Sequence, residues 1–215
     1  MQTIRQRLHA LLLLAALTIS LAVPASAAGS LPFTDVDPSE WYYTYVQDLY
    51  DAGIVDGVTS TAFRPEGTVT FGQALKLVLM AAGYENQAPT GTHWASGFYD
   101  LAQREGLLPS GLNLGLDDAI TRLEIAEITV LAMDLSRTSQ DPSPFDDTDA
   151  EAALILWDHG IFEGSASGDQ ILFQPQDDIS RAEITTVIWR IYHYTPPESP
   201  ETPPTSPEDP DAPEE

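Results

Sequence analysis

Ile179-Ser180-Arg181-Ala182-Glu183 is the segment from which the architecture can be worked out, because it occurs in related form twice earlier in the chain. The earlier copies are Ile120-Thr121-Arg122-Leu123-Glu124 and Val69-Thr70-Phe71-Gly72-Gln73. Each copy places Glu or Gln three residues after Ser or Thr. This is the capping box, in which the two side chains accept hydrogen bonds from each other's backbone N–H at the start of a helix. We therefore predict three helices, each beginning directly after its hydroxyl residue.

Apolar residues follow each box at spacings of three and four, which is typical of a half-buried helix. The predicted core positions are Leu75, Val78, Leu79 and Ala82, then Ile125, Ile128, Leu131 and Leu135, then Ile184, Val187, Ile188 and Ile191. An earlier stripe of Tyr42, Tyr45, Val46, Leu49 and Tyr50 predicts a further helix, which Gly53 ends.

A glycine motif precedes each box. Asp51-Ala-Gly53-Ile-Val-Asp-Gly57 recurs as Arg104-Glu-Gly106-Leu-Leu and as Asp158-His-Gly160-Ile-Phe-Glu-Gly164, with first glycines 53 and 54 residues apart. We therefore predict three helix-loop-helix repeats, at residues 33–84, 92–136 and 145–194. One pair of helices cannot bury its apolar stripes alone, so we expect an all-α fold with the capped helices packed around a pseudo-threefold axis.

The two ends of the chain have a different composition. Residues 1–27 combine Arg5 and Arg7 with an apolar run and a small-residue site, the order of a secretory signal peptide. The run is closed by Pro24 and is shorter than the ~20 residues that a spanning helix needs. We therefore expect export, with no transmembrane segment after cleavage. Residues 195–215 are rich in Pro and acids, and predict a disordered tail.

Charge excludes one class of partner. The chain has 33 acidic and nine basic residues, a net charge of −24, and loss of Arg5 and Arg7 with the signal takes this to −26. Nucleic acid is an unsuitable ligand for such a chain, because phosphate binding needs clustered Lys and Arg. We attribute the acidity to solubility outside the cell. There is no cysteine, so the exported domain depends on its apolar core for stability.

The motifs together resemble the S-layer homology (SLH) domain: Phe33-Thr-Asp35-Val, Trp41, Gly53 with Gly57, Phe63-Arg-Pro65, and the Ser/Thr-Arg-x-Glu box. The resemblance covers nearly all of the chain between its two ends. It implies a non-catalytic, three-pronged helical module without cofactors. It also implies grooves between repeats that bind secondary cell-wall polysaccharide, commonly through a pyruvylated sugar, in a secreted protein of the cell wall or S-layer. Other surface-layer proteins are possible further partners.

Arg122 and Arg181 are the strongest candidate ligand contacts. The first helical position disfavours a cation, because the helix dipole is positive at that end. Two arginines placed alike against this rule indicate a function, such as binding a carboxylate with the guanidinium and the helix N-terminus. The alternative is that each pairs with an acid of its own repeat. Asp35, Trp41, Gly57 and Gly164 are further candidates, although loop formation and packing explain them equally well.

The copies are not identical. The first has Phe71 in place of the arginine, which predicts a weak groove there. Trp94 aligns with Trp41, but the third copy has Thr148 at this position and Trp157 lies out of register. We therefore expect at most two working grooves.

Other functions receive less support. A glycosidase needs two carboxylates, one of them desolvated, and no pair is marked. The histidines lack zinc-site spacing, so no metal is expected. Asp35-Val-Asp37 and Asp146 to Asp149 do not follow the order of a calcium loop. The main alternative is an extracellular protein-binding module that has kept the SLH scaffold without glycan binding.

Overall fold

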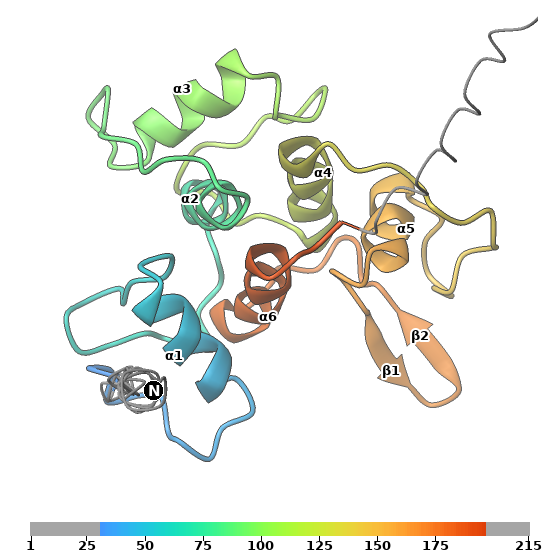
Figure 1. Cartoon of the computed structure of the whole chain (residues 1–215), viewed down its shortest axis with the longest axis horizontal. Helices are drawn as coiled ribbons and strands as arrows, with labels where there is room; N and C mark the ends of the chain where they lie inside the picture. The colour runs from blue at the N-terminus through green and yellow to red at the C-terminus, as the bar shows by residue number, and fades with distance from the viewer. Residues whose placement is uncertain (1–30, 197–215) are drawn as a thin grey trace, which may run out of the picture. The chain divides into compact units, whose positions relative to one another are not determined.

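The computed structural model describes residues 31–196, so the predicted signal peptide and nearly all of the predicted tail lie outside the described residues. Within this range there are six helices and one two-stranded sheet (Figure 1). The elements are α1 (Tyr43–Asp51), α2 (Phe71–Ala81), α3 (Ser96–Arg104), α4 (Arg122–Met133), α5 (Glu151–Asp158), β1 (Ser165–Ser167), β2 (Gln170–Leu172) and α6 (Arg181–Tyr192). We call α1 with α2 pair 1, α3 with α4 pair 2, and α5 with α6 pair 3.

The second helix of each pair begins with a complete capping box. In α6, for example, the Ser180 hydroxyl accepts from the backbone N–H of Glu183 at 3.2 Å, and the Glu183 carboxylate accepts from the backbone N–H of Ser180 at 2.9 Å. The first helices end close to a glycine in the left-handed region, with φ of 71° at Gly53 and 66° at Gly160. Local sequence therefore fixes both boundaries between helix and loop.

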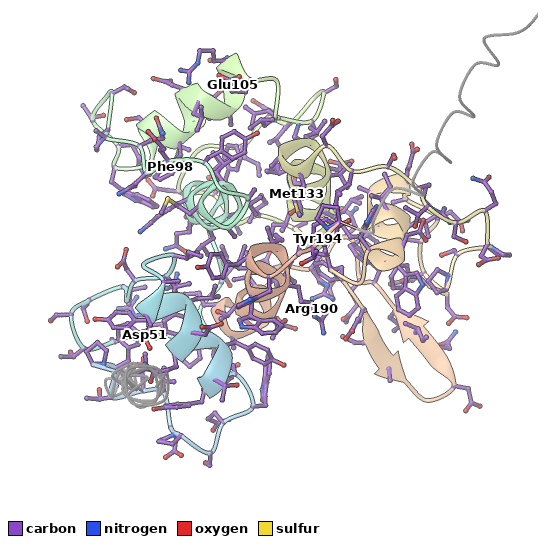
Figure 2. The ribbon with its side chains drawn as sticks, in the orientation of Figure 1. Asp51, Phe98, Glu105, Met133, Arg190 and Tyr194 are labelled. Atoms are coloured by element: carbon purple, nitrogen blue, oxygen red, sulfur yellow. The ribbon has the colours of Figure 1, made fainter. Side chains whose placement is uncertain are left out.

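The helices of one pair do not pack on each other. Instead α1 packs on α6, α3 on α2 and α5 on α4, so that each first helix covers the second helix of another pair. Helices α2, α4 and α6 lie at the centre in Figure 1, and α2 contacts both of the others. Figure 2 shows the side chains, with the buried Phe98 of α3 on the side that faces α2. The apolar core is therefore shared by all three pairs.

Short backbone bridges join the pairs just before the central helices. Thr68 pairs with Ser180, Thr70 with Ala119, and Thr121 with Asp178, each in antiparallel fashion. The connections run from pair 1 to pair 2, from pair 2 to pair 3 and from pair 3 to pair 1, so they form a closed cycle.

Two expectations require correction. The fold is not purely helical, because β1 and β2 form an antiparallel hairpin in the loop of pair 3, with Gly168 at φ 63° in its turn. A two-residue Gly-Asp connection between short runs is a hairpin signal that the helical pattern obscured. Leu131 was predicted to lie in the core but is 39% exposed. Within residues 31–196, no helix is both long and apolar enough to cross a bilayer.

Candidate ligand-binding grooves

Three grooves occupy corresponding places, each beside a central helix and the loop that precedes it within the same pair. Groove 1, of about 300 Å³, lies at α2 and is lined by Asp56, Gly57, Val58, Gln73, Lys76, Leu77, Trp94 and Arg181. Groove 2, of about 320 Å³, lies at α6 and is lined by Trp41, Tyr45, Arg122, Phe162, Glu163, Gly164, Ser165, Ile179, Glu183, Thr186, Val187 and Arg190. Groove 3, of about 580 Å³, lies at α4 and is lined by Gly106, Leu108, Pro109, Ser110, Glu127, Val130, Leu131, Leu135, Ser136, Ala150, Glu151, Ala152 and Ile155.

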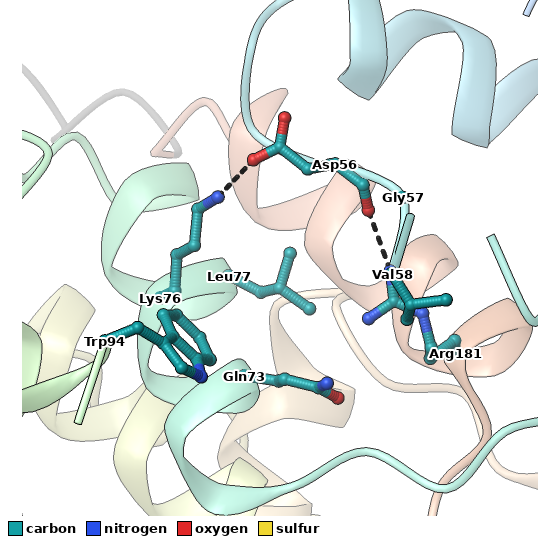
Figure 3. A pocket seen from close by; sticks show the side chains of 8 residues that line it. All are labelled: Asp56, Gly57, Val58, Gln73, Lys76, Leu77, Trp94 and Arg181. Atoms are coloured by element: carbon teal, nitrogen blue, oxygen red, sulfur yellow. Dashed lines mark hydrogen bonds and ion pairs between the residues drawn. The ribbon is translucent and has the colours of Figure 1, made fainter. Parts of the chain in front are cut away.

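Groove 1 receives its two cations from different pairs (Figure 3). Arg181 of pair 3 donates from Nε to the Phe63 carbonyl at 2.8 Å and from Nη2 to the Asp56 carbonyl at 2.9 Å. Lys76 of pair 1 forms an ion pair with the Asp56 carboxylate. Trp94 of pair 2 is 45% exposed on the groove wall. One indole face and two cationic groups therefore meet in a single concave site.

Groove 2 repeats this plan with different side chains. Arg122 of pair 2 donates from Nε to the Phe173 carbonyl at 2.7 Å, and its guanidinium lies 4.7 Å from the ring centre of Phe162. Arg190 donates from Nη2 to the Glu163 carboxylate at 2.5 Å. Trp41 of pair 1 is 57% exposed on the groove wall. Groove 2 is thus the counterpart of groove 1, with each contributing pair moved one step back in the cycle.

Groove 3 lacks all of these features among the residues that line it within the described range. Its charged side chains are Glu127 and Glu151, and its walls are otherwise mainly aliphatic. The helix position that carries arginine in α4 and α6 is occupied in α2 by Phe71, which is buried and donates its backbone N–H to the Asp118 carbonyl of pair 2. The arginine missing from pair 1 is therefore missing from groove 3, not from groove 1.

Arg122 and Arg181 are buried side chains, which indicates a structural role in addition to any contact with a ligand. Arg122 is 5% exposed and Arg181 is 7% exposed. Burial lowers the pKa of both guanidinium groups, although arginine remains protonated even so. Neither side chain is paired with an acid of its own pair: the main partners are carbonyl oxygens of the next pair, and Glu183 of pair 3 lies 3.7 Å from Arg122. The arginines therefore hold neighbouring pairs together and also present one edge to a groove.

The helix N-termini beside the arginines are already satisfied. The backbone N–H groups of Arg181 and Ala182 donate to the carbonyls of Gly67 and Pro65, at 2.9 and 2.8 Å. The corresponding groups of Arg122 and Leu123 donate to Asp177 and Pro175. The expected use of helix N–H groups to bind a carboxylate is therefore not available, and any anion must bind to side chains.

Asp35 has a structural role in the loop that borders groove 1. Its two carboxylate oxygens accept from the backbone N–H of Phe63 and of Arg64, both at 2.8 Å. Burial raises the pKa of Asp35, but these hydrogen bonds outweigh it and hold the pKa below its ordinary value. Asp147 binds the N–H groups of Phe173 and Gln174 in the same way. Arg64 and Gln174 have φ of 58° and 59°, so each carboxylate secures a left-handed residue.

Gly57 and Gly164 are required by the backbone. A Cβ atom at Gly57 would lie 2.3 Å from the Thr59 carbonyl oxygen, and one at Gly164 would lie 2.8 Å from that of Leu172. Both glycines line a groove, but the space explains them without a ligand. Trp157 packs its ring on Phe145, with centroids 5.5 Å apart, and lies outside the three grooves.

Lys76 and Arg190 are the groove residues that the repeat pattern does not reveal. They stand six and ten residues after their cap hydroxyls, so alignment of the copies does not bring them together. The sequence does offer one indication, which is that basic residues are rare. Only seven Lys and Arg follow residue 27, and four of these line grooves 1 and 2.

Comparison with known proteins identifies one part of the chain directly: residues 32–75 match the model of the S-layer homology domain. An endoglucanase of Bacillus sp. (strain KSM-635) is 25% identical over 88% of this chain and 24% of its own length. The surface-layer 125 kDa protein of Lysinibacillus sphaericus is 28% identical over 53% of this chain and 11% of its own. A cell surface protein of Thermoanaerobacter kivui is 31% identical over 48% of this chain and 13% of its own.

Residues 32–75 thus match an SLH domain, and two of these relatives are named as a surface-layer protein and a cell surface protein. Together they indicate an extracellular protein associated with the cell wall, and they support a general role in surface anchoring. The chain spans a quarter or less of the length of these three relatives, and the matched domain is a non-catalytic anchor. The endoglucanase activity belongs to the relative that carries that name.

Proposed function

We propose that the three helix pairs are three SLH repeats, at residues 33–84, 92–136 and 145–194, which anchor the chain non-covalently to the cell wall. The ligand is an anionic secondary cell-wall polysaccharide with a pyruvylated sugar, and it binds in grooves 1 and 2. On this proposal residues 1–27 direct export and residues 195–215 form a tail that takes no part in binding. Surface-layer proteins are further candidate partners.

One observation carries the proposal. Four of the seven basic residues that follow residue 27 line two corresponding grooves, although the chain as a whole has 33 acidic residues. Each of these grooves also has an exposed tryptophan on its wall. A strongly acidic surface repels an anionic polymer, so cations concentrated beside an indole mark the places where such a polymer can bind.

The side chains suit a sugar that carries a carboxylate. Guanidinium and ammonium groups form charge-assisted hydrogen bonds with a carboxylate, which are roughly twice as strong as neutral ones. The apolar C–H face of a sugar ring can pack on the indole of Trp94 in groove 1 or of Trp41 in groove 2. In this proposal Arg181 and Arg122 contact the ligand with the part of the guanidinium group that does not hydrogen-bond to the neighbouring pair. Asp35, Gly57 and Gly164 shape the loops.

The test is sedimentation of residues 28–215 with purified wall sacculi, before and after the secondary polysaccharide is removed. The variant is the double substitution Trp41→Ala and Trp94→Ala, because both rings are exposed and their loss leaves the core intact. Tyr192→Ala is the matched control, since Tyr192 is 45% exposed but lines neither groove 1 nor groove 2.

We expect the wild type and Tyr192→Ala to sediment only with sacculi that retain the polysaccharide, and the double variant to lose at least tenfold in binding. Equal binding by all three proteins would place the site elsewhere. Absence of sedimentation by the folded wild type would remove glycan anchoring and leave the protein-binding module as the better explanation.

A further inference from the structure

Grooves 1 and 2 differ at the third residue of their central helices, a position that is structurally equivalent because it belongs to the capping box in both. Gln73 in α2 and Glu183 in α6 both occupy the third helical position, and both line their groove. Each uses one oxygen for the cap: Oε1 of Gln73 accepts from the backbone N–H of Thr70 at 3.3 Å, and Oε2 of Glu183 accepts from that of Ser180 at 2.9 Å. The other end of each side chain is what a ligand meets.

In groove 2 that end is a carboxylate oxygen. Oε1 of Glu183 lies 3.7 Å from Nη1 of Arg122, so the arginine already faces a negative charge. An anion that approaches Arg122 has to overcome repulsion from Glu183. Glu163 adds a second carboxylate to the groove, paired with Arg190. Groove 2 therefore has two cations and two carboxylates on its walls.

In groove 1 the corresponding end is an amide NH2 group. Because the cap requires the Gln73 oxygen, its nitrogen is directed away from the cap, and it has no hydrogen-bond partner among residues 31–196. It is a donor to an anion, and it brings no charge close to Arg181. Asp56 is the one acidic side chain on the groove wall, beside the cations Lys76 and Arg181 (Figure 3). Groove 1 therefore has a positive excess that groove 2 lacks.

We propose that groove 1 is the tighter of the two anion sites and that the choice between Gln73 and Glu183 sets the difference. The inference rests on the proposed function. From the sequence a weak groove is expected at the first copy, because Phe71 replaces the arginine there. The reverse holds in this proposal: Gln73, from the same capping box, makes groove 1 the stronger anion site. A carboxylate about 4 Å from the bound charge at a protein surface accounts for a five- to tenfold difference in Kd.

The test exchanges the two residues, because either side chain preserves the capping box. The variants are Gln73→Glu and Glu183→Gln. The probe is a methyl glycoside with a 4,6-O-pyruvate ketal, and the same glycoside without the ketal is the neutral control. Binding is followed by NMR through the indole N–H signals of Trp94 in groove 1 and Trp41 in groove 2, assigned with Trp→Phe variants.

We expect the Trp94 signal of the wild type to titrate at five- to tenfold lower ligand concentration than the Trp41 signal. Gln73→Glu should weaken groove 1 by a similar factor, Glu183→Gln should strengthen groove 2, and the neutral glycoside should show neither effect. The ranking of the two grooves is overturned if both signals report binding but the two affinities are equal or in the opposite order. It is also overturned if the substitutions Gln73→Glu and Glu183→Gln leave the affinities unchanged. If neither signal responds and sacculi do not sediment the protein, the proposed function fails as well.

Discussion

Grooves 1 and 3 are built from the same kinds of element and have opposite character. Each lies beside a central helix and the loop that precedes it, yet Lys76 in groove 1 corresponds to Glu127 in groove 3. Trp94 has no aromatic counterpart among the residues that line groove 3. The helix position that supplies Arg181 to groove 1 is occupied, for groove 3, by the buried Phe71. Three different pairs thus supply the side chains by which the two grooves differ.

The comparison shows that the side chains lining groove 1 come from all three pairs, so the character of a groove is set where pairs meet. A substitution in one repeat changes the groove of another, since the arginine of pair 3 serves the groove of pair 1. Sequence departures assigned to single repeats were therefore assigned to the wrong sites. The following predictions test how far the two grooves differ, beginning with the largest expected effect.

Replacing Arg181 by Ala should destabilise the whole domain by about 3 kcal/mol, measured as the free energy of unfolding in urea. The substitution leaves the buried carbonyl of Phe63 without its donor and removes the guanidinium from the Phe63 ring, 4.6 Å from its centre. Arg104→Ala is the control, because Arg104 is exposed and its ion pair within residues 31–196 is with the adjacent Glu105. It should change stability by less than about 0.5 kcal/mol. Similar values for the two variants would show that Arg181 is not a structural link.

The loop of groove 1 is held by Asp35, which accepts two backbone N–H groups from 28 and 29 residues away, whereas before α4 Asp118 accepts one, from the nearby Gly115. Asp35→Asn should cost about 1–2 kcal/mol at pH 7, because two charge-assisted hydrogen bonds are weakened. The pKa of Asp35 is lowered in the folded protein, so its contribution is present above the unfolded pKa of about 3.9 and is lost as the pH falls through the folded value.

Urea unfolding at several pH values checks this prediction. The gap between wild type and Asp35→Asn should be full at pH 6–7 and should narrow below about pH 4. The control is Asp149→Asn, because Asp149 is exposed; it should change the free energy of unfolding at pH 7 by less than about 0.5 kcal/mol. A gap that stays constant into acid would mean that the carboxylate charge does not hold the loop.

The smallest effect is expected in groove 3. Burial and the nearby Glu124 raise the pKa of Glu127 above its ordinary 4.5, so the ionised form is disfavoured by folding. Glu127→Gln should therefore stabilise the protein by about 0.3–0.5 kcal/mol at pH 7, measured by thermal unfolding. The gain should disappear near pH 4, where wild-type Glu127 is protonated. Destabilisation at pH 7 would show that groove 3 depends on this charge.

Much of the fold could be predicted because its signals are local. The boxes at Thr70, Thr121 and Ser180 depend on side chains three residues apart, and the glycine at position 53 depends on its own backbone angles. The hairpin at residues 165–172 was missed because its strands have three residues each and neither is regularly buried. Leu131 fits the helical stripe, but only the tertiary packing determines which part of the stripe is covered.

The candidate site was only partly accessible from sequence. Arg122 and Arg181 stood out because they broke a rule of helix electrostatics at equivalent positions. Their partners could not be foreseen, since Arg181 and Phe63 are 118 residues apart. Lys76 and Arg190 escaped notice because the groove is formed by three segments whose order in space follows the packing of the pairs, not the alignment of the copies.

The exchange of partners among the pairs also bears on how the protein carries a load. Because α1 covers α6, α3 covers α2 and α5 covers α4, no pair owns a complete core, and the bridges return from the third pair to the first. A surface protein is pulled by whatever it holds. The three pairs therefore cannot unfold one after another under tension. Separation of one pair exposes the core that all three share, so we expect the domain to unfold mechanically in a single step.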